Sequence, residues 1–181
     1  MTDSPSLEEK FRNNTLAWFE LIGSMLDDLN AVGLTGYDSA PISSASAAIS
    51  LMKGEKLIAY FIAGHDHWDK IANRDLKFVT EEIPKIYGKA TIDVKAIVEP
   101  AKVYLAIKTK GNYKGSAKED DWPVNSQDME RQWKYFDAMV NLSCRYGANR
   151  KNYPPRIPED VDKHIKEIDF AKYGKLFNIK Y

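Results

Sequence analysis

The stretch SQDMERQWKYFDAMVNLSCRY, residues 126–146, carries the clearest structural signal in the chain. Its apolar residues form two stripes at helical spacing. One stripe consists of Met129, Trp133, Phe136, Val140 and Cys144, and the other consists of Tyr135, Met139, Leu142 and Tyr146. At ~100° per residue, the two stripes face opposite sides of a helix. A helix that is apolar on two opposed faces has to be buried on both, so we expect a compact helical domain with a central helix near 126–146.

The second stripe of this helix has two interpretations. Either the helix is surrounded by its own domain on all sides, or one of its faces meets a partner. Tyrosine and methionine are among the residue types enriched in the cores of protein interfaces. The candidate interface therefore consists of Tyr135, Met139, Leu142 and Tyr146.

The N-terminal segment predicts a second long helix, over residues 6–31. Ser6 and Glu9 have the spacing of a capping box, in which the two side chains satisfy backbone N–H groups that the helix leaves free. From Phe11 onward, apolar residues recur every three or four positions. Gly33 suits the left-handed position that commonly ends a helix.

The next part of the chain predicts shorter helices. Residues 42–53, rich in serine and alanine, predict a narrow helix that ends at Gly54. The apolar run 57–63 is either a strand or a buried helix, because a continuous apolar run does not reveal a period. Residues 66–87 predict another helix, which Pro84 kinks or shortens.

Residues 90–110 have a different pattern. Apolar and polar residues alternate over 92–98 and again over 103–109, apart from Ile97 on the polar side. Pro100 falls between the two runs, at the favoured second position of a type I turn. Inside a helix the same proline would cost about 3 kcal/mol. We therefore expect a β-hairpin here, which makes the fold class mainly α with a β-hairpin (α+β).

The composition is that of one globular domain. The chain has 181 residues, with 26 Lys+Arg against 26 Asp+Glu and one cysteine, which is about the length of a single domain. The N-terminus lacks the basic and apolar regions of a signal peptide, and no apolar run approaches the ~18 residues of a membrane span. We expect a single domain over 1–181 that is soluble, intracellular and cytoplasmic. A proline-rich connector at 148–158 leads to a C-terminal amphipathic segment.

Basic and aromatic residues gather at the C-terminal end of the predicted central helix. Residues 131–156 include six basic residues and one acidic residue. Arginine and tyrosine together can pair with phosphates and stack on unpaired bases. Binding of single-stranded nucleic acid through 145–156 is therefore an alternative function. Its candidate contacts are Arg145, Arg150, Lys151, Tyr153 and Arg156.

The segment HDHWD, residues 65–69, suggests a metal site. Two imidazoles separated by one residue at a strand end point to one side and can share a metal ion, with Asp69 supplying an oxygen. The segment resembles the H-x-H-x-D-H motif of metallo-β-lactamase-fold hydrolases, with Lys70 in place of the final histidine. The resemblance implies a metal-dependent hydrolase with His65, His67 and Asp69 as ligands. The alternative is that the histidines form a polar cap at the start of a helix.

The leading hypothesis from the sequence is a non-catalytic interaction or assembly protein, such as a structural subunit of a virion or another particle. The two-faced helix would supply a contact surface. The acidic residues 1–50 and the more basic remainder would suit self-association or docking on a protein partner. No catalytic residue and no cofactor is expected, and the sequence favours a non-enzymatic role.

Overall fold

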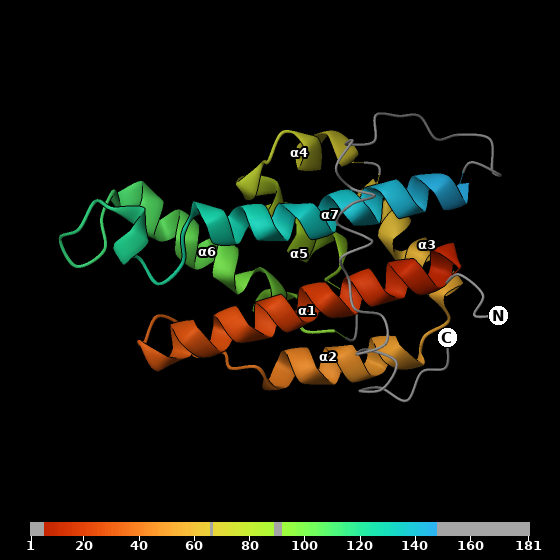
Figure 1. Ribbon diagram of the computed structural model, residues 1–181, viewed down its shortest axis with the longest axis horizontal. Coiled ribbons are helices and arrows are strands. Elements are labelled where there is room, and N and C mark those ends of the chain that lie inside the picture. The colour runs from red at the N-terminus through yellow and green to blue at the C-terminus, as the bar shows by residue number, and fades with distance from the viewer. Residues whose placement is uncertain (1–5, 66, 89–91, 148–181) are drawn as a thin grey trace, which may run out of the picture.

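The computed structural model describes residues 6–65, 67–88 and 92–147, and its elements are helical (Figure 1). The longer helices are α1 (Leu7–Ala31), α2 (Ala40–Leu51), α3 (Gly54–His65), α6 (Val94–Lys110) and α7 (Ser126–Gly147). The shorter elements are α4 (Trp68–Ala72), a π-helical turn (Phe78–Glu82), α5 (Ile83–Ile86) and a 3₁₀ turn (Glu119–Asp121). Within these described residues there is no β-strand, and the one β-bridge joins Tyr113 to Ser116.

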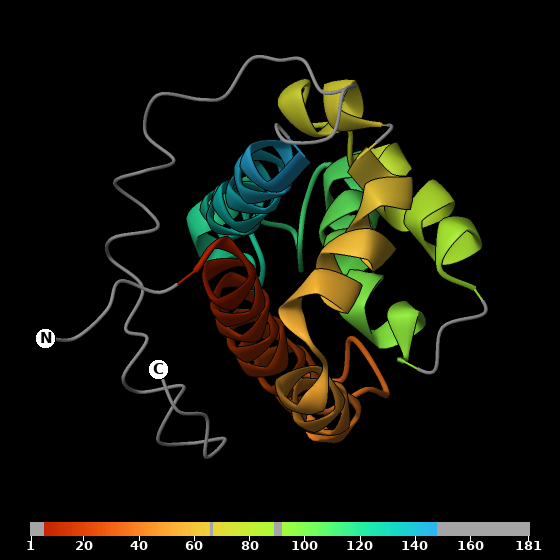
Figure 2. The ribbon, with the colours of Figure 1, turned by 90° about the vertical axis from the view of Figure 1, so that its right-hand side faces the viewer.

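Two long helices, α1 and α7, form the spine of the fold. They run antiparallel and pack against each other, and the side-chain amide of Asn14 donates to the backbone carbonyl of Tyr135 at 2.9 Å. Helix α2 packs on α1. Figure 2, seen from the end near α3, shows helices α3 to α6 on one side of the row that α7, α1 and α2 form. Buried side chains from all five longer helices meet in one continuous core.

Both ends of α1 confirm the sequence prediction. The Ser6 hydroxyl accepts a hydrogen bond from the Glu9 N–H at 3.2 Å, and the Glu9 carboxylate accepts one from the Ser6 N–H at 3.0 Å. At the other end, Gly33 has a φ of +74°. The N–H groups of Gly33 and of the residue after it donate to carbonyls in the last turn of the helix. This is the Schellman arrangement, so local sequence is sufficient to predict where α1 begins and ends.

The β-hairpin predicted at 90–110 is wrong, because this segment contains helix α6. Asp93 caps the helix by accepting a hydrogen bond from the Ala96 N–H at 3.2 Å, and Gly111 ends it with a φ of +86°. The buried side chains recur every three or four residues, as one helical face requires. They are Ala96, Ile97, Val98, Pro100, Ala101, Val103, Tyr104 and Ile107.

Pro100 is tolerated inside α6 because the helix is held by tertiary packing. A proline at this position removes one backbone hydrogen bond and costs about 3 kcal/mol. The ring is buried with the rest of the apolar face, and that burial offsets the cost. Ile97, the exception to the strand alternation, is only 6% exposed. Ile97, which does not fit the strand alternation, therefore fits the buried face of the helix.

The helix predicted at 126–146 is present as α7. The Asn125 side chain accepts a hydrogen bond from the Asp128 N–H at 3.1 Å, and the Asp128 carboxylate accepts one from the Asn125 N–H at 3.0 Å. Helix α7 packs against α1, α3 and α4. Every residue from 136 to 143 is buried, so the helix occupies the interior of the domain over this stretch.

The single helix predicted over 66–87 is divided in the structure. Helix α4 ends before Arg74, whose φ of +55° is left-handed. The chain resumes as the π-helical turn, which runs directly into α5, and Pro84 is the second residue of α5. The run 57–63, which the sequence left open, is helical as part of α3. The connector predicted at 148–158 and the segment after it lie outside the described residues.

Helices α1 and α3 touch at Gly54. The sequence predicted that this glycine ends a helix, whereas it is the first residue of α3. A Cβ atom at this position would lie 2.6 Å from the backbone oxygen of Glu8, at the start of α1. The missing side chain thus lets the two helices begin in direct contact, and this contact fixes α3 beside the spine.

Candidate ligand-binding site

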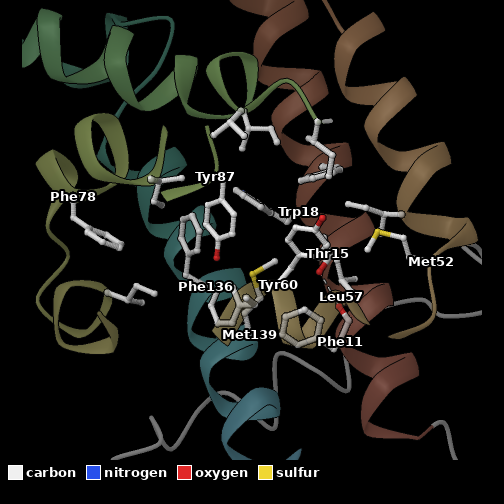
Figure 3. A pocket seen from close by; sticks show the side chains of 18 residues that line it. Phe11, Thr15, Trp18, Met52, Leu57, Tyr60, Phe78, Tyr87, Phe136 and Met139 are labelled. Carbon is white, nitrogen blue, oxygen red and sulfur yellow. Dashed lines mark hydrogen bonds between the residues drawn. The ribbon is translucent and has the colours of Figure 1, made fainter. Parts of the chain in front are cut away.

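An apolar pocket lies among the helices, beside the spine. Its volume is about 260 Å³, and eighteen described side chains line it (Figure 3). In Figure 3, Phe78 lies at one end of the pocket and Met52 at the other, with Tyr87 and Phe136 between them. The aromatic members of the wall are Phe11, Trp18, Phe19, Tyr60, Phe61, Phe78, Tyr87 and Phe136.

The two spine helices supply one side of the wall. Phe11, Thr15 and Trp18 of α1 follow one another at intervals of four and three residues, so they share one helical face. Phe136 and Met139 of α7 are three residues apart and also share a face. Phe136 belongs to the first apolar stripe predicted for α7 and Met139 to the second. The pocket therefore lies where the edges of these two stripes meet.

Helices on the other side complete the wall and leave a mouth. Helix α3 contributes Leu57, Tyr60 and Phe61, and α6 contributes Val94 and Ile97. Leu57 and Ile97 are buried, whereas Tyr60 is 57% exposed although it lines the pocket. A side chain that touches both the pocket and the solvent marks the boundary between them. The mouth of the pocket is therefore beside α3.

The chemistry of the pocket is that of apolar and aromatic surface. None of the described residues that line it carries a charge. The Thr15 hydroxyl already donates to the Phe11 carbonyl at 2.9 Å. The rings of Phe11 and Phe61 are tilted, with centroids 5.5 Å apart, and those of Trp18 and Phe136 are 4.9 Å apart. Such tilted rings present both faces and edges, which suit a flat or chain-like apolar molecule.

An ion pair next to the pocket fastens α4 to α7. Two guanidinium nitrogens of Arg74 donate to the two carboxylate oxygens of Asp137, at 2.7 and 2.8 Å. Arg74 also lies 3.5 Å from a carboxylate oxygen of Glu130 and 5.5 Å from the ring centroid of Trp133. The Asp137 side chain is only 7% exposed. This bidentate contact holds the end of α4 against the centre of α7.

The same arginine contacts the backbone of a residue that lines the pocket. Its guanidinium donates to the backbone carbonyl of Ile71 at 3.3 Å, and Ile71 lines the pocket. The left-handed backbone of Arg74 is unusual for a residue with a side chain. The energy spent on that conformation is offset by the paired hydrogen bonds with Asp137. Arg74 is thus a positioning residue for one side of the pocket.

Two of the four predicted interface residues are buried within the domain. Leu142 is fully buried, Met139 is 3% exposed and lines the pocket, and Tyr135 is half-buried. Tyr146 belongs to the last turn of α7, but its side chain is outside the described part. The burial of Met139 and Leu142 favours the interpretation in which α7 is surrounded by its own chain.

The predicted nucleic-acid segment falls almost wholly outside the described residues. Arg145 belongs to α7, and its side chain is not described. The remaining candidate contacts, Arg150, Lys151, Tyr153 and Arg156, all follow the last described residue. This alternative function therefore stays a prediction.

The predicted metal ligands are not arranged as the strand geometry requires. His65 is the last residue of helix α3 and not the end of a strand, and His67 precedes α4. The His67 ring packs on Phe78, with centroids 5.4 Å apart, and Asp69 is exposed. The side chain of His65 is not described, and among the side chains that are, no three His, Cys, Asp or Glu groups cluster as metal ligands. The metal site stays a prediction.

Sequence reasoning missed both the pocket and the ion pair. The stripe through Phe11 and Trp18 was visible, but a stripe that faces a pocket has the same spacing as one that faces packed side chains. Asp137 gave a usable signal, because it is an acidic residue on a helix with two apolar faces. A carboxylate in such a place needs a partner, although the sequence does not say that the partner is Arg74.

Over the described residues, no helix is both long and apolar enough to cross a membrane. No protein-family model, curated protein or solved structure matches this chain.

Proposed function

We propose that this protein is a non-catalytic binding protein for a small apolar ligand, which occupies the pocket between the spine and helices α3 and α6. The observation that carries the proposal is a pocket of about 260 Å³ beside the core, lined by eight aromatic residues. Protein interiors are packed to a density of about 0.74 and rarely contain large voids. An engineered apolar cavity of about 150 Å³ is sufficient to bind benzene.

The lining supports an apolar occupant in preference to a polar one. A polar ligand would lose hydrogen bonds with water, and the pocket offers few groups to replace them. An apolar ligand that buries about 250 Å² of surface gains roughly 6 kcal/mol at ~25 cal/mol per Å². That gain corresponds to a dissociation constant in the tens of micromolar.

The test is a titration with N-phenyl-1-naphthylamine, an uncharged fluorophore whose emission rises in apolar surroundings. We expect saturable binding at one site per chain. Val94 lines the pocket and is half-buried, so Val94→Trp should fill part of the pocket and weaken binding by at least tenfold. Leu105, also half-buried on α6, does not line the pocket, so Leu105→Trp is the matched control.

Two results would contradict the proposal. One is the absence of saturable binding by the wild-type chain. The other is equal binding by the Val94→Trp and Leu105→Trp variants, which would mean that the fluorophore occupies another surface. Circular dichroism of each variant separates blocked binding from loss of the fold.

The assembly hypothesis from the sequence stays a separate prediction. A ligand-binding domain can also self-associate, and light scattering at two salt concentrations measures its mass directly. A monomer of 20.6 kDa would argue against self-association and leave the ligand-binding proposal unaffected.

A further inference from the structure

The mouth of the pocket combines exposed apolar groups with positive charge. Tyr60 is 57% exposed, and Leu51, next to the lining residue Met52, is 88% exposed. Lys53 follows Met52 directly. Lys56 precedes Tyr60 by four residues on α3, so Lys56 and Tyr60 share one helical face. Both lysines are exposed. Two exposed lysines and Glu55 therefore lie near the end of the pocket that meets solvent, whereas the interior carries no charge among its described residues.

Both lysines are available to an external anion. Among the described residues, the ion pairs are those of Arg74 and Arg131, and neither lysine of the mouth takes part in them. Glu55 lies between the two lysines in sequence, but it already interacts with another group of the protein. Lys53, directly before α3, and Lys56, in the first turn of α3, thus place two ammonium groups near the apolar opening.

We propose that the ligand is an anionic single-chain amphiphile, with its hydrocarbon chain in the pocket and its acidic head against Lys53 and Lys56. This inference rests on the proposed function and adds the chemical class of the ligand. The hydrocarbon chain of the ligand lies against the uncharged wall. The acidic head remains in solvent, where a carboxylate keeps its hydration while it contacts the lysines. A free fatty acid and a monoacyl phosphate or sulfate share this chemistry.

The experiment is competition against bound N-phenyl-1-naphthylamine by three ligands with the same chain: dodecanoate, dodecyl sulfate and dodecanol, all below their micelle-forming or solubility limits. An exposed ion pair changes an equilibrium by up to about fivefold. With two lysines, we expect both anions to bind roughly threefold to tenfold more tightly than the alcohol at low salt. The preference should shrink as salt screens the charges.

The variant Lys53→Gln/Lys56→Gln should remove the preference for the anions and leave the affinity for dodecanol unchanged. The matched control is Lys102→Gln/Lys110→Gln, because these lysines are also exposed and lie on α6. The end of α6 that bears Lys110 is at the opposite end of the molecule from the start of α3 (Figure 1). The control variant should keep the full preference.

The outcomes distinguish the two proposals. Equal affinities for anion and alcohol, or a preference that survives Lys53→Gln/Lys56→Gln, would overturn the anionic head while leaving an apolar-ligand site. Failure of all three ligands and of the fluorophore to bind would overturn both. A preference for dodecanoate alone over dodecyl sulfate would narrow the class to carboxylic acids, and equal binding of the two would support any acidic head.

Discussion

The ion pair between Arg74 and Asp137 allows a quantitative prediction. The Asp137 side chain is 7% exposed in the structure, and Arg74→Ala removes two hydrogen bonds from its carboxylate, of 2.7 and 2.8 Å. Removing one partner of a buried pair costs about 3–5 kcal/mol. Because the Arg74 side chain itself is 34% exposed, water can partly replace it. We therefore expect the free energy of unfolding to fall by about 2–3 kcal/mol.

The measurement is urea unfolding followed by far-UV circular dichroism, with Lys77→Ala as the control. Lys77 is exposed, so its loss should change stability by no more than about 0.5 kcal/mol. A second variant, Arg74→Gly, loses the same side chain but relieves the left-handed backbone. It should be about 1 kcal/mol more stable than Arg74→Ala.

A double-mutant cycle tests whether the cost arises from the pair itself. Once Asp137→Ala has removed the buried carboxylate, Arg74→Ala should cost much less, which gives a coupling energy of at least about 1.5 kcal/mol. Additive effects of the two substitutions, or a cost of Arg74→Ala no larger than that of Lys77→Ala, would refute the reasoning. The Arg74→Ala variant should also bind the fluorophore several-fold less tightly, because Ile71 loses its contact with the guanidinium.

Three further predictions concern other parts of the fold. Gly54→Ala places a Cβ 2.6 Å from the backbone oxygen of Glu8, so urea unfolding should show a loss of about 2–3 kcal/mol; Gly36→Ala, with open space around it, should not show this loss. Pro100→Ala restores a helical N–H and should raise the unfolding free energy by about 1 kcal/mol, whereas a fall of that size would contradict the helical account. Burial raises the pKa of Tyr104 above its ordinary value of 10.0. The folded chain therefore keeps this proton when the unfolded chain loses it, so stability should decline above pH 10, and Tyr104→Phe should reduce that alkaline loss in unfolding measured across pH.

The sequence is informative where structure depends on neighbours along the chain. The capping box of Ser6 and Glu9, the left-handed Gly33 and the periodic stripes of 126–146 all act within a few residues, and each was recognised. The prediction for residues 90–110 was wrong because the local patterns and the tertiary packing favour different structures. Alternation and Pro100 favoured a hairpin, whereas tertiary burial of one helical face outweighed both.

The candidate site depends on contacts that spacing does not reveal. Trp18 and Phe136 come from opposite ends of the described chain, yet their rings lie 4.9 Å apart. Nothing in either local pattern says whether the space in front of them is filled. The same holds for Arg74, whose partner lies 63 positions further along the chain. The wall and the positioning ion pair are therefore properties of the packed fold.

The antiparallel spine has a consequence for how the pocket comes into being. Asn14 and Tyr135, which join its two helices, are 121 positions apart in the chain. Contacts of such high sequence separation slow folding, because a long loop must close before the contacts stabilise it. During synthesis, the pocket therefore has no wall on the α7 side until most of the chain has been made. A ligand that binds only the finished pocket would then stabilise the folded chain, by about 2.7 kcal/mol when the free ligand concentration is one hundred times its dissociation constant. Binding of the ligand would therefore indicate that the chain has completed folding.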